Sequence, residues 1–184
     1  MGSNRSILLQ KDEIEEIEKD TGFTSKQIKR LYNRFTNLDK SNSGYLTRND
    51  FVRIPELHIN PLRDRIVEVI IEDNGDDEKI NFRQFVKVFS TFRRAKNDTN
   101  SKENKLKFLF SVYDRDKDDR INKNELKSIL NMLVGNNLPE EQMNAIAERT
   151  IAELGADGNI TFQKFCETLE KIDIDEKMSM KFLT

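Results

Sequence analysis

The stretch DRDKDDRINKNE, residues 114–125, has acidic side chains spaced as in a metal-binding loop. Acidic side chains stand at positions 1, 3, 5, 6 and 12 of this stretch, and the branched aliphatic Ile121 stands at position 8. Carboxylates at this spacing can face one another across a tight loop and surround a hard cation. A solvated surface loop is the alternative, and Asp119 favours it, because calcium loops carry glycine at position 6.

A local pattern built around this aliphatic residue occurs four times along the chain. A branched aliphatic residue is followed by Thr or Asn, and a hydrophobic residue stands five positions after the aliphatic one, in LTRNDF (46–51), INFRQF (80–85), INKNEL (121–126) and ITFQKF (160–165). The successive spacings of 34, 41 and 39 residues are typical of stacked supersecondary units. Amphipathic stretches with helical periodicity flank each copy. Helix, 12-residue polar loop and helix is the EF-hand arrangement, so the sequence predicts an all-α fold with four EF-hands.

The four hands are expected to form two lobes, because one helix–loop–helix unit cannot bury its apolar face alone. The loops are residues 39–50 (hand 1), 73–84 (hand 2), 114–125 (hand 3) and 153–164 (hand 4). Paired loops are expected to touch through short two-residue β contacts at position 8. The predicted organisation is an N-terminal segment with a leading helix (1–24), an N-lobe with hands 1 and 2 (25–92), a polar linker (93–104), a C-lobe with hands 3 and 4 (105–171) and a tail (172–184).

Hand 3 has the strongest ligand set for Ca²⁺. The expected ligands are the side chains of Asp114, Asp116 and Asp118, the backbone carbonyl of Arg120, Asn122 through a water, and Glu125. Asp119 must then adopt the left-handed conformation, which Asp tolerates better than most residues. We therefore predict one good calcium site in this loop.

Hand 1 has a weaker ligand set. The candidates are Asp39, Ser41, Ser43, the backbone of Tyr45 and Asp50. Gly44 keeps position 6, but Asp50 at position 12 is one methylene shorter than Glu, so two-oxygen coordination is poor. Weak calcium binding, magnesium binding and a hydrogen-bonded loop without an ion all fit this sequence.

Hands 2 and 4 are predicted to be structural. Hand 2 has Gly75 at position 3 and Gln84 at position 12, so the closing carboxylate is missing. Hand 4 has Gly155 at position 3 and a cation, Lys164, at position 12. These hands still serve to close the core of each lobe.

Charge distribution, hydropathy and the motifs present argue against several classes of function. The 31 basic and 33 acidic residues are well mixed, which does not favour a nucleic-acid partner. No apolar run reaches the ~18 residues that a membrane helix needs, and the single cysteine, Cys166, lies in an apolar segment typical of a buried thiol in a reducing compartment. No Ser/His, Cys/His or paired-acid arrangement stands apart from the calcium ligands, so no enzymatic activity is predicted.

The N-terminal segment and two predicted helices offer candidate interaction sites. MGSNRS fits the N-myristoylation pattern with Gly2 as acceptor, and an unmodified terminus is the alternative. One acyl chain binds membranes only marginally, so a second contact through a membrane-bound partner is expected. Met132, Leu133 and Met143 are candidates for a groove that receives an amphipathic helix, with core packing as the alternative.

The chain resembles calcineurin B and, more closely, the calcineurin B homologous proteins. The stretches that carry the resemblance are MGSNRSILL, TGFTSKQIKRLYNRFTNLDKSNSG, RIPELHINPL, NKLKFLFSVYDRDKD, MLVGNNL and KMSMKFLT. The resemblance implies an N-myristoylated adaptor that binds the juxtamembrane helix of a plasma-membrane sodium/proton exchanger and supports its activity, stability or trafficking.

The resemblance further implies a cytoplasmic protein that associates peripherally with the plasma membrane or endomembranes and also reaches the nucleus. Regulation or inhibition of a calcineurin catalytic subunit is the alternative role, and simple calcium buffering is a third. The family normally keeps hands 3 and 4 as calcium sites, so the disabled loop of hand 4 is a departure.

Overall fold

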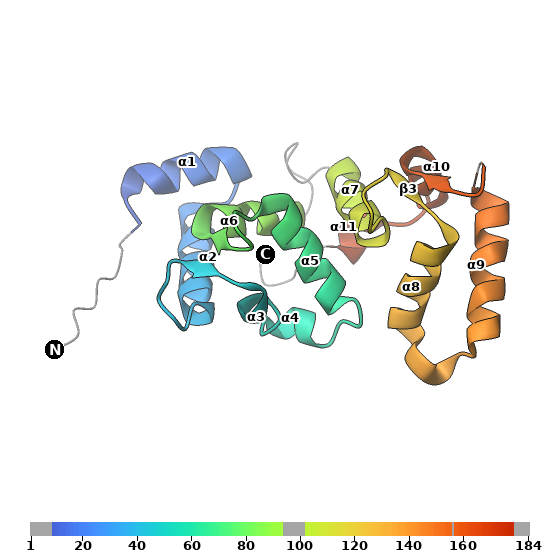
Figure 1. Ribbon diagram of the computed structural model, residues 1–184. Helices are drawn as coiled ribbons and strands as arrows, with labels where there is room; N and C mark the ends of the chain where they lie inside the picture. The colour runs from blue at the N-terminus through green and yellow to red at the C-terminus, as the bar shows by residue number, and fades with distance from the viewer. Residues whose placement is uncertain (1–8, 94–101, 156, 179–184) are drawn as a thin grey trace.

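The computed structural model describes residues 9–93, 102–155 and 157–178, and the predicted all-α fold is confirmed (Figure 1). The first half contains α1 (Lys11–Thr21), α2 (Ser25–Leu38), β1 (Tyr45–Leu46), α3 (Arg48–Phe51), α4 (Pro55–His58), α5 (Arg63–Asn74), β2 (Ile80–Asn81) and α6 (Phe82–Thr91). The second half contains α7 (Lys102–Tyr113), β3 (Arg120–Ile121), α8 (Lys123–Val134), the 3-10 turn η2 (Gly135–Asn137), α9 (Glu140–Leu154), β4 (Ile160–Thr161), α10 (Phe162–Thr168) and α11 (Ile174–Lys177).

The loops pair as the repeat predicts. β1 and β2 are antiparallel with Leu46 opposite Ile80, and β3 and β4 are antiparallel with Ile121 opposite Ile160. Each of these residues stands at position 8 of its loop and is at most 4% exposed. The β contacts therefore join hand 1 to hand 2 and hand 3 to hand 4 through the core of each lobe.

The N-lobe has the larger core, which α1, α2, α3, α5 and α6 share. Phenylalanine rings dominate it: the ring of Phe85 lies 4.5 Å from that of Phe89 and 5.4 Å from that of Phe35. Arg93 belongs to this lobe, since it is buried over the ring of Phe23 and donates to the carbonyl of Thr21. The predicted linker lies outside the described residues at 94–101, and α7 begins at Lys102.

The C-lobe core is smaller and is centred on Phe110, Ile121, Ile151 and Ile160. Cys166 is half-buried on α10, not buried as the sequence predicts, and no described residue of this helix is fully buried. Burial raises the pKa of its thiol. Among the described residues, no helix is both long enough and apolar enough to cross a bilayer.

Helix α2, which carries hand 1, begins at a capping box. The hydroxyl of Thr24 accepts the backbone N–H of Gln27, and the side chain of Gln27 accepts the backbone N–H of Thr24. We expect Thr24→Ala to lower the free energy of unfolding by about 1 kcal/mol, because the first turn loses its side-chain acceptor. Urea unfolding followed by circular dichroism measures this, and Thr36→Ala on the same helix is the control. Equal stability of both variants would contradict the role of the cap.

Candidate functional site

The loop of hand 3 lies between helices α7 and α8. Helix α7 ends at Tyr113, immediately before loop position 1, and α8 begins at Lys123 after an N-cap at Asn122. The amide oxygen of Asn122 accepts the backbone N–H of Glu125 at 3.0 Å, and the carboxylate of Glu125 accepts the backbone N–H of Asn122 at 3.0 Å. The end of the loop is therefore fixed by reciprocal hydrogen bonds.

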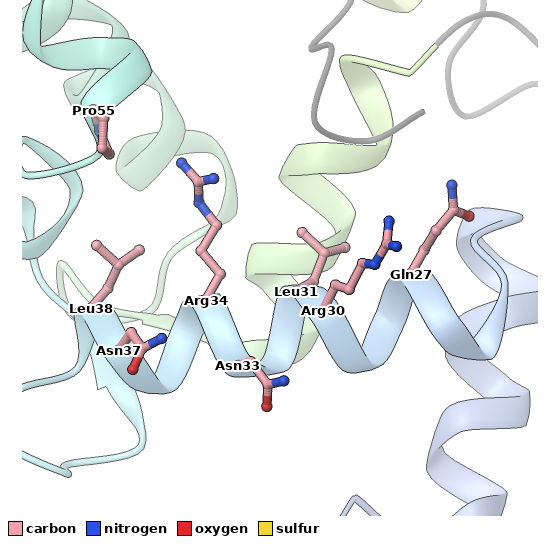
Figure 2. A pocket seen from close by; sticks show the side chains of 8 residues that line it. All are labelled: Gln27, Arg30, Leu31, Asn33, Arg34, Asn37, Leu38 and Pro55. Carbon is pink, nitrogen blue, oxygen red and sulfur yellow. The ribbon is translucent and has the colours of Figure 1, made fainter.

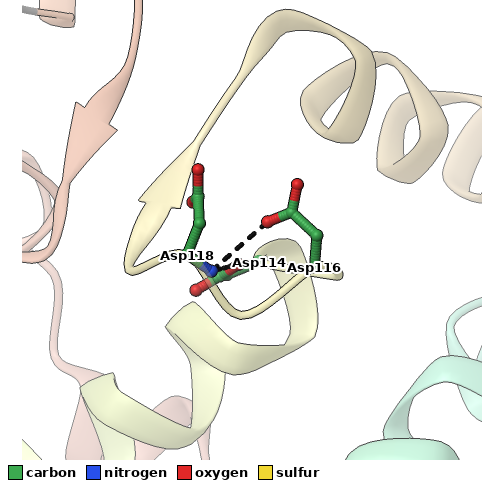
Figure 3. Close-up of side chains that lie close together, drawn as sticks. All are labelled: Asp114, Asp116 and Asp118. Carbon is green, nitrogen blue, oxygen red and sulfur yellow. Dashed lines mark hydrogen bonds between the residues drawn. The ribbon is translucent and has the colours of Figure 1, made fainter.

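The three aspartates of this loop lie together, as Figure 3 shows. Asp114, Asp116 and Asp118 each present a carboxylate oxygen, and these oxygens lie within 4.8 Å of one another. Asp114 is 5% exposed, and its carboxylate accepts the backbone N–H groups of Asp118 at 3.3 Å and Asp119 at 3.0 Å. Asp119 has a φ of +62°, the left-handed conformation that calcium coordination by this loop requires.

Glu125 closes the loop from the other end. Its Oε1 accepts the backbone N–H of Arg115 at 2.7 Å and of Asp116 at 3.3 Å, so the carboxylate spans from position 12 to positions 2 and 3. Arg120 donates its backbone N–H to Asp118 at 2.9 Å, while β3 extends from the same residue. Of the six predicted hand 3 residues, the structure clusters the carboxylates of Asp114, Asp116 and Asp118 and holds Glu125 by hydrogen bonds to the backbone of positions 2, 3 and 9.

The electrostatics of this cluster fit a divalent cation. Burial raises the pKa of the Asp114 carboxyl, the neighbouring charge of Glu125 raises it further, and backbone N–H groups oppose both. A carboxylate whose charged form is disfavoured by its surroundings gains most from a cation placed beside it. Four carboxyl groups and an amide oxygen form the hard oxygen donor set that Ca²⁺ takes in proteins.

The polar side chains of hand 1 form hydrogen bonds within their own loop. Asp39 accepts hydrogen bonds from the hydroxyls of Ser41 at 3.0 Å and Ser43 at 3.3 Å and from the backbone N–H of Gly44 at 2.7 Å. Burial of Asp39 raises its pKa, but these hydrogen bonds outweigh burial, and the pKa is lowered overall. Asp50 accepts from both the N–H and the hydroxyl of Thr47. Asp114 and Glu125 accept equivalent backbone hydrogen bonds in hand 3, and metal binding at hand 1 stays a prediction.

In hands 2 and 4 the entering helix extends into the loop, which the sequence does not predict. Helices α5 and α9 continue through loop positions 1 and 2, and the backbone N–H of the glycine at position 3 caps each helix. A Cβ at Gly75 would lie 2.7 Å from the carbonyl oxygen of Ile71, and a Cβ at Gly155 would lie 2.7 Å from that of Ile151. These glycines therefore have two effects. They provide no side-chain ligand, and their lack of a Cβ allows the entering helix to extend into the loop.

An apolar groove lies between the lobes. Its cavity has a volume of about 330 Å³ and is lined by Phe51, Ile54, Glu56, Leu57, Asn60, Leu62, Ile66, Ile70, Val88, Phe89, Phe92, Phe108, Leu109, Val112, Lys177 and Met178. Met178, the last described residue, packs against the N-lobe core, and α11 before it is anchored by an ion pair between Asp175 and Lys105. Hydrophobic periodicity in the sequence could not locate this groove, because its lining residues come from segments that are far apart along the chain.

A second cavity of about 490 Å³ follows the outer face of α2. Figure 2 shows Leu31, Arg34 and Leu38 on the side of α2 that faces Pro55 of α4. Arg34 forms an ion pair with Glu56, which lines the apolar groove. Residues of α4 therefore line both cavities, Pro55 the second one and Glu56 the apolar groove.

The predicted groove residues lie elsewhere in the described chain. Met143 is buried on α9, Leu133 is 45% exposed on α8, and Met132 packs against Val69, Val112 and Ile129. None of the three lines the apolar groove. Their role in partner binding stays a prediction, and Gly2 lies outside the described residues.

Comparison with known proteins places the chain in a family. The EF-hand domain pair family matches residues 103–177. The chain is 42% identical over 183 residues to the calcineurin B of Naegleria gruberi, covering 98% of this chain and 99% of that protein. It is 38% identical over 182 residues to calcineurin B type 1 of Dictyostelium discoideum, covering 97% and 98%, and 37% identical over 171 residues to the calcineurin B of Candida glabrata, covering 92% and 94%. Identity at this level along nearly whole chains, on a fold of four paired hands, shows that the protein belongs to the calcineurin B family.

Proposed function

We propose that the protein is a calcium-binding regulatory subunit that receives an amphipathic helix of a calcineurin-type catalytic chain in its apolar groove. The observation that carries the proposal is the groove between the lobes, lined mainly by apolar side chains and bordered by Lys177 and Met178. A groove of this kind suits a helix that presents apolar residues at helical spacing. The names of the relatives, all calcineurin B, support a phosphatase partner.

Hand 3 supplies the calcium dependence in this proposal. Asp114, Asp116, Asp118 and Glu125 would hold the ion, with the carbonyl of Arg120 and Asn122 completing the set. Bound calcium would supply positive charge that neutralises these carboxylates. The backbone N–H groups that now bind Asp114 and Glu125 keep the loop close to the required conformation, so little ordering is left for the binding step.

The sodium/proton exchanger helix is the second candidate partner, and it rests on the sequence stretches that resemble the calcineurin B homologous proteins. It would use the same groove, because the apolar lining suits the apolar stripe of an amphipathic helix from either protein. Myristoylation at Gly2 and peripheral attachment to membranes belong to either assignment. Intact-mass measurement after co-expression with an N-myristoyltransferase tests the acylation, which would add one acyl chain to Gly2.

Co-purification separates the two partners. The full chain is expressed with a calcineurin-type catalytic chain or with the juxtamembrane helix of an exchanger fused to a carrier protein. We expect the catalytic chain to co-purify at equal stoichiometry in calcium, to be released in part by chelator, and to show higher phosphatase activity. Capture of the exchanger helix without the catalytic chain would contradict the phosphatase assignment and support the adaptor.

A further inference from the structure

Arg65 of α5 reaches across the two lobes with a buried guanidinium group. Its side chain is 3% exposed, and it donates to three backbone carbonyls at the end of α7. Nε donates to Val112 at 3.1 Å, and one terminal nitrogen donates to Ser111 at 2.6 Å and to Asp114 at 2.9 Å. The last carbonyls of a helix lack intrahelical partners, and a cation there also complements the helix dipole. Arg65 therefore caps the helix that enters hand 3.

The third of these carbonyls belongs to a candidate metal ligand. Asp114 stands at loop position 1, so Arg65 fixes the backbone of the residue whose carboxylate lies at the centre of the acidic cluster. The other terminal nitrogen of Arg65 donates to Glu68 at 3.0 Å, which holds the guanidinium in place from its own helix. A buried planar group with this many aligned acceptors is pre-organised, unlike a lysine at the same position.

Two more contacts join the same helix to hand 3. Lys117, at loop position 4, places its ammonium 3.1 Å from Glu72 and 3.3 Å from Asp73, both in the last turn of α5. Val69 of α5 also packs against Val112 and Ile129, which lie on the helices that enter and leave hand 3. Helix α5 therefore touches hand 3 before, within and after its loop.

The two helices that Arg65 connects both line the apolar groove. Ile66 and Ile70 of α5 line it, and Phe108, Leu109 and Val112 of α7 line it as well. A change in the position of α7 at the loop end must therefore be passed to α5 or break the contacts of Arg65. The contacts of Arg65 therefore connect the groove and the acidic loop.

We propose that Arg65 is a positioning residue that couples the ligand loop of hand 3 to the apolar groove, so that occupation of either site favours the other. The inference rests on the proposed function, because it uses hand 3 as the calcium site and the groove as the docking site. Thermodynamic linkage requires the coupling to be reciprocal: calcium tightens binding in the groove by the same factor by which a groove ligand tightens calcium binding.

The test measures this coupling factor in the full chain without any partner protein. The apolar dye 8-anilinonaphthalene-1-sulfonate probes the groove, and the factor is the ratio of its Kd in chelator to its Kd in calcium. Calorimetry measures calcium affinity separately. We expect a wild-type factor in the range of about 5 to 150 that falls to within about twofold of 1 in Arg65→Met.

Three further variants separate coupling from simple loss of stability. Arg65→Lys keeps the charge but not the fork of donors, and we expect an intermediate factor. Arg63→Met, two residues earlier on α5, should keep the wild-type factor, because Arg63 contacts Asp64 and His58 instead of hand 3. Lys117→Met removes a half-exposed ion pair, so it should fold normally and still reduce the factor at least twofold.

A wild-type factor in both Arg65→Lys and Lys117→Met would overturn the inference, whether or not Arg65→Met folds. The same holds if calcium binds to the wild-type chain without changing the affinity of the dye. Intact coupling together with failure to capture a catalytic chain would instead reject only the phosphatase assignment. A purely structural Arg65 would lower the melting temperature and leave the factor unchanged.

Discussion

Glu125→Gln is expected to weaken calcium binding at hand 3 by more than about 100-fold, beyond what the loss of an outer-sphere partner costs. Position 12 supplies the two-oxygen carboxylate that closes a calcium loop, and glutamine removes its charge and one of its acceptors. The carboxylate accepts the backbone N–H of Arg115 through one oxygen and that of Asn122 through the other, and the amide places its NH2 donor against one of these N–H groups. The loop would then lose both a ligand and its closed conformation.

Isothermal titration calorimetry measures this effect directly, and Asp50→Asn at hand 1 is the matched control. The strongest site should disappear in Glu125→Gln and stay unchanged in Asp50→Asn. Loss of the strongest site in the Asp50 variant instead would assign it to hand 1. A stoichiometry of zero in the wild-type chain would reject calcium binding altogether.

Leu109→Glu is expected to weaken binding of the catalytic chain by at least about 30-fold, the loss typical of a central interface residue. Leu109 is half-buried, lines the apolar groove and belongs to none of the core clusters of the described residues, so a charge there should disturb the groove more than the fold. A glutamate facing the apolar stripe of a bound helix would bury an unpaired charge.

Leu133→Glu is the matched control for this prediction. Leu133 is 45% exposed on α8 and lies outside the groove, although its side-chain chemistry makes it a groove candidate in the sequence. Surface plasmon resonance with the immobilised catalytic chain compares the two variants. Normal binding by the Leu109 variant and lost binding by the Leu133 variant would move the docking surface to α8 and the C-lobe.

The local parts of the structure could be predicted because their causes lie close together in the sequence. The spacing of Leu46, Ile80, Ile121 and Ile160 predicts four hands and both β contacts, and the structure confirms them. The acids of hand 3 likewise follow from a 12-residue pattern, and Asp119 adopts the left-handed conformation expected of it. In each case the residues that determine the feature lie within one loop or recur at the same position of every loop.

The features that could not be predicted depend on residues far apart in the sequence. Arg65 is separated by 46 to 49 positions from the residues whose carbonyls it binds, and nothing in its own segment indicates this. Side-chain chemistry alone points to methionines of the C-lobe for the groove, whereas its walls come from helices of both lobes and from the C-terminal segment. In hand 1, the sequence leaves three outcomes open, because only the folded loop shows that Ser41 and Ser43 donate to Asp39.

The close packing around Gly75 and Gly155, at position 3 of hands 2 and 4, makes it hard to introduce a ligand side chain at these positions. Introducing aspartate at Gly75 would restore an oxygen to the sequence but would drive its Cβ against the carbonyls of Ile71 and Lys79, at 2.7 and 2.9 Å. The helix would first have to end earlier and the loop reopen, which takes several changes at once. We therefore expect substitutions that change calcium binding by this chain to act in hand 3 and in the residues that support it, rather than at these two glycines.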